Sequence, residues 1–493
     1  MKYKLVLLAF FTLFFFNNVY SQKISFENCS KCSLTSVTNL PTGNILSLYT
    51  FSYEKGDFTD YEIYIHNPSG KLLKTTKLKI EYQSSLQDKG SIITKDALYL
   101  TFYDIDFIRL LKIDFDGNIK SDKRIEVTKE EQKFYFERVS PYFPLSGSLN
   151  VVENNNEIYI FSMYKINKLR YGIMSRRISN AGKTLWTNKI TPEKGSYEIK
   201  QVEVSDASVF IVSTKKAKIK EGESNRIFFI IDKNNGKLKK EVDLIHNEGT
   251  LMPSNIQRTT DGVVLSGLFF DAKDSKGVFV GKYDDNGKQT QIYTYDWEKM
   301  YSLKMKDDTS FMNPNMRLKF VASYIKDNKI TLVAEEFSTG LNLMPDLSIM
   351  LTSFYISPNN KNQILGNVVT LAVDLSTGNI ESKSLNKIHS EAIKVTLTGI
   401  MPKAEVKLIG LLDDFGYTRI IRTEVFNEKI FLLLKKGKNT FLFETISDGN
   451  IEQKDVDTSD INPKYGLYIY ISSGKILYKA VEKKEYSVWQ ESF

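Results

Sequence analysis

A short phrase built around glycine recurs seven times along this 493-residue chain and constrains the fold more than any other feature. One or two small polar residues precede the glycine, Lys or Asn usually follows it, and an apolar residue lies nearby. The seven glycines are Gly70, Gly117, Gly182, Gly236, Gly287, Gly378 and Gly449. A turn that repeats implies a supersecondary unit that repeats. We expect each glycine to supply the positive φ of a two-residue type I′ or II′ hairpin.

A second recurrent segment precedes each glycine phrase and has the composition of a β-strand. It contains four to six β-branched, aromatic or leucine residues after a turn rich in Asn, Asp or Gly, as in 157–161 and 208–212. A third strand runs into the glycine turn, and a fourth, half-polar strand leaves it. This gradient predicts four-stranded blades whose inner strands are apolar and whose last strand meets water.

The end of the chain supplies three more strand-like segments, 467–471, 475–481 and 486–489. The N-terminal segment 23–27 can provide the missing outer strand of that last blade and so close the ring. We therefore predict an all-β fold, a closed β-propeller of eight four-stranded blades, with seven blades as the alternative.

The spacing of the glycines also indicates where the repeat is interrupted. A bare blade takes about 40 to 50 residues, and the gaps on either side of Gly378 are the longest. We assign three inserted segments between the fifth and seventh blades, at about 295–316, 340–363 and 390–416, and expect them to form one cap.

The first 21 residues have the pattern of a signal peptide. Lys2 and Lys4 form a basic start, residues 5–16 are apolar, and cleavage is expected near Ser21, before Gln22. No stretch reaches the roughly 20 apolar residues of a membrane span. The prediction is a secreted or periplasmic protein in which residues 22–493 form a single propeller domain.

Only two cysteines are present, Cys29 and Cys32. A redox pair normally lies in a βαβ unit, which is missing here, and zinc needs two further ligands. The three histidines are scattered singly. We predict a local structural disulfide between Cys29 and Cys32, and no metal site.

The formal net charge is +8, and lysines alternate with acidic residues through the turns. Nucleic-acid binding favours a basic stripe on one face. We therefore expect no nucleic-acid partner.

Two of the glycine phrases, 231–237 and 373–379, resemble the repeat of quinoprotein-like β-propellers. In that family an Asp, a Thr-Gly-Lys turn and a Trp recur in each blade, and here only Trp186 stands at the position of the docking tryptophan. The resemblance implies a propeller of the exported, non-catalytic branch that binds or scaffolds. Quinone-dependent dehydrogenase activity is not carried over, and no cofactor is expected.

The chain contains no nucleophile elbow, paired-histidine metalloprotease motif or phosphate-binding loop. Glycoside hydrolysis needs two facing carboxylates, and Asp296 and Asp413 on neighbouring insertions are the catalytic candidates. The candidate binding residues in the three inserted segments are Trp297, Met300, Met344 and Asp414.

These observations lead to two hypotheses. The first is an exported, non-enzymatic, monomeric β-propeller that recognises an envelope or extracellular protein or glycan through its inserted face. The alternative is a carbohydrate-active hydrolase or lyase on the same scaffold, which would require the two carboxylates to meet.

Overall fold

The computed structural model describes residues 24–27, 32–51, 58–81, 85–94, 96–103, 106–138, 149–168, 170–216, 224–247, 249–271, 274–304, 312, 316–338, 365–386, 420–435, 439–447, 450–459, 461, 466–481 and 485–491. The described residues form eight antiparallel sheets, seven of four strands and one of five. The chain is an eight-bladed β-propeller, which confirms the first of the two predicted blade counts.

Seven blades follow one another along the chain, and in each the strands pair in sequence order. Blade 1 consists of β2 (Cys32–Asn39), β3 (Ile45–Phe51), β4 (Phe58–His66) and β5 (Leu72–Glu81). Blade 2 consists of β6 (Ser85–Ile93), β7 (Ala97–Tyr103), β8 (Phe107–Asp114) and β9 (Ile119–Glu126). Blade 3 consists of β10 (Leu149–Asn154), β11 (Glu157–Asn167), β12 (Arg170–Ile178) and β13 (Thr184–Ile190).

The next two blades continue this order. Blade 4 consists of β14 (Ser196–Val204), β15 (Ser208–Lys216), β16 (Ser224–Asp232) and β17 (Leu238–Asp243). Blade 5 adds a short strand β18 (Ile245–His246) to β19 (Gly249–Thr259), β20 (Gly262–Asp271), β21 (Asp274–Asp284) and β22 (Gln289–Asp296).

Blades 6 and 7 adjoin the predicted insertions. Blade 6 consists of β23 (Met316–Lys326), β24 (Lys329–Ser338), β25 (Leu365–Asp374) and β26 (Ile380–Asn386). Blade 7 consists of β27 (Ile420–Phe426), β28 (Lys429–Lys435), β29 (Thr440–Ser447) and β30 (Asn450–Asp457). In blades 2 to 7 we call β6, β10, β14, β19, β23 and β27 the first strand of the blade. The strand that follows each of them along the chain is the second strand of that blade.

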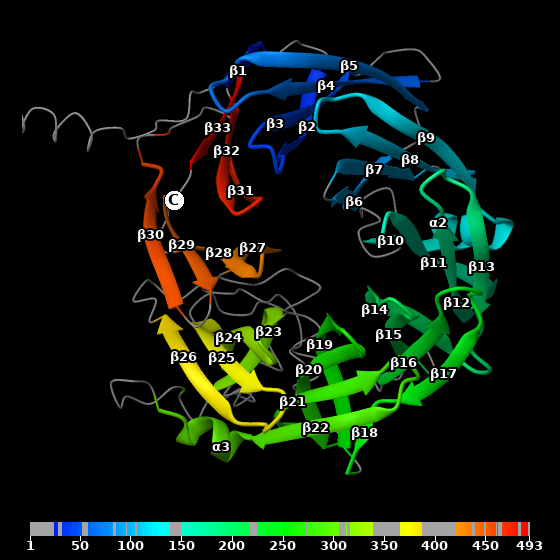
Figure 1. Ribbon diagram of the computed structural model, residues 1–493, viewed down its shortest axis with the longest axis vertical. Helices are drawn as coiled ribbons and strands as arrows, with labels where there is room; N and C mark the ends of the chain where they lie inside the picture. The colour runs from blue at the N-terminus through cyan, green and yellow to red at the C-terminus, as the bar shows by residue number, and fades with distance from the viewer. Residues whose placement is uncertain are drawn as a thin grey trace, which may run out of the picture. The chain divides into compact units, whose positions relative to one another are not determined.

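The eighth blade combines the two ends of the described chain. It contains β31 (Gly466–Ser472), β32 (Lys475–Val481), β33 (Glu485–Glu491) and, from the N-terminus, β1 (Ile24–Glu27). β1 lies beside β33 (Figure 1) and pairs with it antiparallel. In this pairing Phe26 is opposite Tyr486. The prediction that the N-terminal segment supplies the outer strand of the last blade is confirmed.

The strands group into two compact units. The first unit holds blades 1 and 8 together with the turn 115–118, and the second holds the strands of blades 2 to 7. Within the first unit, Asn39 Nδ2 donates to the carbonyl oxygen of Ser472 over 3.1 Å, and Ser473 Oγ donates to the carbonyl oxygen of Asn39 over 2.9 Å. Blades 1 and 8 are therefore joined through buried and partly buried hydrogen bonds.

Burial is greatest in the middle strands of each blade. All seven residues of β7 are buried, whereas β9 is mostly exposed and β10 is mostly of intermediate exposure. The apolar side chains pack between neighbouring blades, as where Phe161 and Ile173 of blade 3 share one cluster with Ile211 and Phe229 of blade 4. The hydrophobic core is therefore a series of interfaces between blades.

The glycine turns have the predicted positive φ but are longer than predicted. Gly182 has a φ of 78°, its N–H donates to the carbonyl oxygen of Ser179 over 2.8 Å, and the Ser179 N–H donates to the carbonyl oxygen of Lys183 over 2.9 Å. This is a three-residue hairpin loop with a left-handed glycine, a common arrangement with a bulge beside it. In the longer Gly236 turn, the Gly236 N–H donates to the carbonyl oxygen of Asp232 over 2.9 Å. The prediction of two-residue hairpins was wrong at these turns.

Polar side chains explain the longer loops. Asp232 Oδ1 accepts hydrogen bonds from the N–H groups of Asn234 and Asn235 over 2.8 and 3.2 Å, as an Asx turn does. Two-residue turns with two positive φ angles, as in type I′, occur instead between the first and second strands. They are Asn155–Asn156, Asp327–Asn328, Asn427–Glu428 and, between β31 and β32, Ser473–Gly474.

Each of several turn glycines also receives a side chain from the preceding blade. The indole of Trp186 in β13 packs on Gly236 of blade 4, and its Nε1 donates to the carbonyl oxygen of Lys233 over 2.8 Å. A Cβ at Gly236 would lie 2.7 Å from Trp186 Cδ2. Trp186 therefore occupies the docking position that the resemblance assigned to it. Tyr293 takes the corresponding place at Gly378, where a Cβ would lie 2.3 Å from Tyr293 Cδ1.

The helix α2 (Lys129–Arg138) anchors the connection between blades 2 and 3. Glu131 is buried and forms an ion pair with Arg176, whose Nη1 donates to Glu131 Oε1 over 2.7 Å. Burial alone would raise the pKa of Glu131, but the hydrogen bonds and charge of Arg176 outweigh it and hold the pKa below its usual value. Within the described ranges, no helix is long and apolar enough to cross a bilayer.

Candidate functional site

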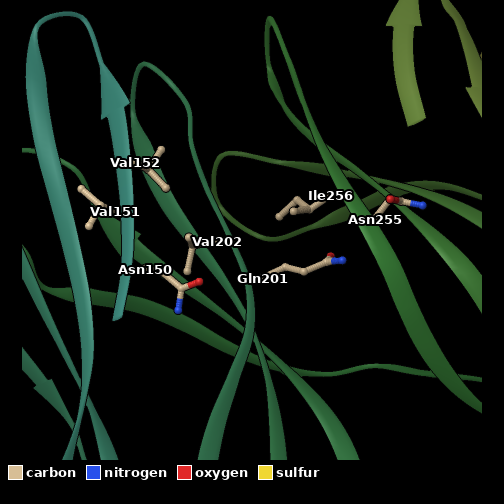
Figure 2. Close-up of a pocket in the computed structure, with 7 residues that line it drawn as sticks. All are labelled: Asn150, Val151, Val152, Gln201, Val202, Asn255 and Ile256. Atoms are coloured by element: carbon tan, nitrogen blue, oxygen red, sulfur yellow. The ribbon is translucent and has the colours of Figure 1, made fainter. Parts of the chain in front are cut away.

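A cleft with a volume of about 310 Å³ opens on the first strands of blades 3, 4 and 5 (Figure 2). All three blades belong to the second compact unit, and β14 contacts both β10 and β19. The described residues that line the cleft are Asn150, Val151, Val152, Gln201, Val202, Asn255 and Ile256. They are carboxamides and aliphatic side chains, so the described part of the lining is uncharged.

The three carboxamides occupy the same register position in consecutive blades. Asn150 pairs with Phe161, Gln201 with Val212, and Asn255 with Ser266. In each blade the partner is the fifth residue of the second strand, counted from its first residue. We call Asn150, Gln201 and Asn255 the amide row.

β-Bulges precede two members of the amide row. The register of β14 against β15 shifts between Ile199 and Gln201, and that of β19 against β20 shifts between Pro253 and Asn255. A bulge inserts one unpaired residue and redirects the side chains that follow it. The bulges thus set the direction of Gln201 and Asn255 locally.

Gln201 links two blades. Its side chain extends from β14 toward the strand that carries Asn255 and Ile256 (Figure 2), and its Nε2 donates to the carbonyl oxygen of Ser254, the extra residue of the bulge in β19. This bond fixes which end of the carboxamide faces β19.

The carboxyl group of Glu203 lies two residues beyond Gln201 on β14. Its Oε1 accepts a hydrogen bond from the N–H of Val204 over 3.0 Å, and burial raises its pKa above the usual value. Glu203 is not among the described residues that line the cleft, and that described lining contains no carboxylate.

Three of the residues singled out from the sequence lie together at the end of blade 5. Asp296 is the N-cap of the short helix α3 (Trp297–Ser302), and its Oδ1 accepts the N–H of Lys299 over 2.7 Å. Trp297 and Met300 are buried in the hydrophobic cluster of blades 5 and 6, and Trp297 Nε1 donates to the carbonyl oxygen of Ser275 over 2.8 Å. These contacts fix the start of the first inserted segment to the core.

Other predicted site residues lie outside the described residues. They are Asp413, the partner proposed for Asp296, together with Met344, Asp414 and Cys29. The pairing of Asp296 with Asp413, the binding roles and the disulfide of Cys29 with Cys32 stay predictions.

The adjacent acids Glu335 and Glu336 are both buried in β24. Glu336 Oε2 accepts hydrogen bonds from the backbone N–H and the Nδ2 of Asn367, over 3.0 and 2.8 Å. This carboxylate therefore holds β25 against β24. Among the residues that the structure describes, no three His, Cys, Asp or Glu side chains gather as a metal site.

The comparisons with known proteins give no family. No protein-family model matches the chain, and no curated protein matches it. Solved structures do resemble it at low sequence identity. One is a polysaccharide lyase, with a TM-score of 0.43 and 11% identity over 82% of this chain and 90% of that chain.

Two further similar structures come from named organisms. The β-propeller domain of the trilobed protease from Pyrococcus furiosus gives a TM-score of 0.39 and 9% identity, over 86% of this chain and 95% of that one. The quinohemoprotein alcohol dehydrogenase of Pseudomonas putida HK5 gives 0.39 and 10%, over 94% and 76%. The fold assignment rests on the strand pairing of the chain itself.

Sequence reasoning missed the amide row. Asn150, Gln201 and Asn255 recur at the blade period of roughly 50 residues, which is a signal that an alignment of the blades on their second strands would have revealed. The bulges displace the first strands by one residue in blades 4 and 5 but not in blade 3, and this hides the alignment in the bare sequence.

Proposed function

We propose that this chain is an exported, non-enzymatic β-propeller that binds a protein or a glycan. The observation that carries the proposal is the lining of the cleft, whose described residues offer carboxamides and aliphatic groups but no acid, base or nucleophile. Such a lining can orient a ligand by hydrogen bonds and dispersion, whereas acid–base chemistry needs a titratable group within reach of the ligand.

The inserted face supplies the rest of the recognition surface in this proposal. In blade 6, Met316 pairs with Ser338 and Phe337 with Leu365, so the described ends that flank two of the insertions lie at one end of the sheet. Val368 pairs with Asn386 and brings the start of the third insertion to that same end. Long connections that share one end of a rigid scaffold commonly carry binding function.

The carbohydrate-active alternative needs two carboxylates on opposite sides of a scissile bond. Asp296 is engaged as a helix cap, and Glu203 accepts the Val204 N–H and is not among the described residues that line the cleft. Neither residue supplies the pair, so the binding proposal is the better supported of the two.

A capture experiment tests the binding proposal. The full chain without residues 1–21 is immobilised and exposed to envelope and culture-medium extracts, and bound proteins and glycans are identified by mass spectrometry. We expect a reproducible set that is lost with the double variant Asn150→Ala, Asn255→Ala. An identical set with the double variant, or none with the wild type, would contradict the proposal.

An assay for released ends tests the alternative directly. We expect no new reducing or unsaturated ends when the protein is incubated with a panel of polysaccharides. Ends that appear with the wild type and disappear with Asp296→Asn or Glu203→Gln would establish an enzyme. Export and the monomeric state are tested by fractionation of the source cells and by light scattering after gel filtration.

A further inference from the structure

The exposed apolar side chains of the described residues gather at one position of the repeat. Eight large apolar side chains are exposed in the described part of the chain, and five of them come two or three residues after a turn glycine. These five are Leu72 and Leu73 in blade 1, Ile119 in blade 2, Leu185 in blade 3 and Leu238 in blade 4. Single exposed apolar residues scattered over a surface are ordinary, whereas these recur at one position of successive blades.

The glycine hairpin itself does not require an exposed apolar residue at this position. Ile119 in blade 2 and Leu238 in blade 4 begin their outer strands, each opposite an isoleucine. The same place in blade 5 is taken by Gln289, which is exposed and begins β22. In blades 6 and 7, Ile380 and Ile451 come two residues after their glycines and are half-buried against the core. Among the first seven blades, apolar exposure at this position is therefore a property of blades 1 to 4.

Leu185 and Leu238 lie on two hairpins that are fixed to each other. Trp186, next to Leu185, is buried and packs on Gly236, two residues before Leu238. Its Nε1 donates to the carbonyl oxygen of Lys233 in the same turn over 2.8 Å. β13 and β17 are edge strands of their sheets and lie along the outer rim of the second unit (Figure 1). Leu185 and Leu238 are 45% and 43% exposed, so apolar surface is presented at two adjacent, rigid points of this rim.

Lysines border these two leucines and outnumber the acidic residues. In blade 3, residues 179–185 include Lys183 and no acid. In blade 4, residues 232–240 include four lysines and a single acid, Asp232. Asp232 Oδ2 lies 3.9 Å from the Nζ of Lys239, whereas Lys183 and Lys237 are exposed to solvent. The rim of blades 3 and 4 therefore combines apolar side chains with positive charge.

We propose that this rim contacts the surface of an anionic lipid bilayer, with Leu185 and Leu238 inserted between the lipids and Lys183 and Lys237 beside the phosphates. Binding to a bilayer surface combines buried apolar area with attraction to anionic lipids, and each lysine near such a surface strengthens the attraction. The rim lies on the outer strands and the cleft on the first strands, so the proposal does not depend on the proposed function.

The separation of the leucines favours a bilayer over a protein partner. Thr184 precedes Leu185, and Lys237 and Lys239 flank Leu238, all three of them exposed. A protein interface has a closely packed apolar core, which leucines separated by polar residues do not form. A fluid bilayer closes around separate apolar side chains while its phosphates contact the lysines. A second copy of this chain would set lysines against lysines across a symmetric contact, which like charges oppose.

Sedimentation with sucrose-loaded vesicles tests the proposal, using the full chain without residues 1–21. One set of vesicles contains phosphatidylglycerol and phosphatidylethanolamine, and the other contains phosphatidylcholine alone. We expect binding to the anionic set only, with an affinity that falls by at least about threefold in Leu185→Ser and in Leu238→Ser because less apolar surface is buried. The double variant Lys183→Gln, Lys237→Gln should lose at least about fivefold. Val425→Ser is the matched control, because Val425 is 46% exposed but lies on the first strand of blade 7, and it keeps full binding.

Melting curves establish that each variant is folded, and Leu238→Trp provides a gain instead of a loss. Tryptophan favours the interface of a bilayer, so this variant should bind the anionic vesicles more tightly, with an emission that shifts to the blue when they are added. Undiminished binding in both serine variants would overturn the proposal. So would an absence of vesicle binding by the wild type, or equal binding to phosphatidylcholine. A dimer that light scattering detects and the serine variants abolish would assign the rim to a second copy of the chain and would also overturn it.

Discussion

The glycine turns and the first strands of the blades differ in how residue type relates to structure. At the glycine turns, different side chains achieve one structural result, because Trp186 and Tyr293 each dock on the glycine of the following blade. At the amide row, similar carboxamides recur in three blades and then give way to Ala322 and Arg422. The turns differ in docked residue and in length but keep a glycine with positive φ, whereas the first strands share a register position and differ in the side chain placed there.

This difference separates stability from recognition. A docked side chain on a turn glycine excludes water from the interface between two blades, and any large side chain with a suitable shape suffices. A carboxamide at the partly exposed position of a first strand contributes little apolar burial. The proposed function accounts for its recurrence by contact with a ligand. The predictions below remove one feature at a time from each region.

The largest expected loss comes from the docking tryptophan. Trp186 is 8% exposed and belongs to the cluster shared by blades 3 and 4. Trp186→Ala should lower the free energy of unfolding by about 4 kcal/mol, through lost burial and the cavity left behind. Urea titration followed by circular dichroism measures it. Leu185→Ala, at the exposed neighbour, should change stability by less than about 0.5 kcal/mol. Equal losses would show that docking does not stabilise the interface.

The second-largest loss of stability is expected at Gly236, the glycine on which Trp186 packs. Gly236 has a φ of 73°, and a Cβ there would lie 2.7 Å from the indole. Gly236→Ala should cost about 3 kcal/mol, from backbone strain and from displacement of Trp186. Gly43→Ala is the control, because its φ is 84° but the nearest atom to a Cβ is 3.6 Å away, in Pro68.

The control should therefore cost only the backbone strain, about 1 kcal/mol. In a Trp186→Ala background, the stability cost of Gly236→Ala should fall to the same value of about 1 kcal/mol. If it keeps its full effect there, the close approach of the indole is not the reason for the glycine.

The regular part of the molecule could be predicted from the sequence, because its signals are local. The strands, the glycine positions and the pairing of β1 with β33 follow from apolar runs and turn residues along the chain. The length of the glycine turns was predicted wrongly. Whether a loop closes over two, three or four residues depends on hydrogen bonds such as those of Asp232 with Asn234 and Asn235.

The candidate site could not be predicted in the same way. Asn150, Gln201 and Asn255 are separated by whole blades, and no local pattern distinguishes them from other polar residues in strands. What brings them together is the register of each first strand, including the bulges before Gln201 and Asn255. Conversely, Trp297 and Met300 stood out by residue type, yet both are buried in the core.

A smaller, pH-dependent loss of stability is expected from His66, at the end of β4 and beside the Gly70 turn. His66 is 4% exposed, and burial lowers its pKa to about 4. An unfolded histidine titrates near 6.5, so the unfolded state binds the proton first as pH falls. The stabilisation is complete above pH 6.5 and is lost between pH 6.5 and about 4, by roughly 2 kcal/mol.

Urea titrations of the wild type and His66→Gln at pH 7.5, 5.5 and 4.5 measure this effect. The wild type should lose more stability than the variant across that range. Parallel pH profiles would mean that His66 is not buried in its neutral form.

The smallest effect on stability is expected at the amide row, where the comparison is sharpest. Asn150 is partly exposed and has no hydrogen-bond partner among the described residues that Asn150→Ala would leave unpaired, so the free energy of unfolding should change by less than about 0.5 kcal/mol. The same variant should lose ligand binding by at least tenfold, because a hydrogen bond to the ligand worth about 1.4 kcal/mol corresponds to that factor. Trp186→Ala, measured where it is still folded, should show the reverse, a large loss of stability with ligand affinity nearly unchanged. A variant series in which stability and affinity fell together at both positions would show that the first strands and the outer turns serve a single structural purpose.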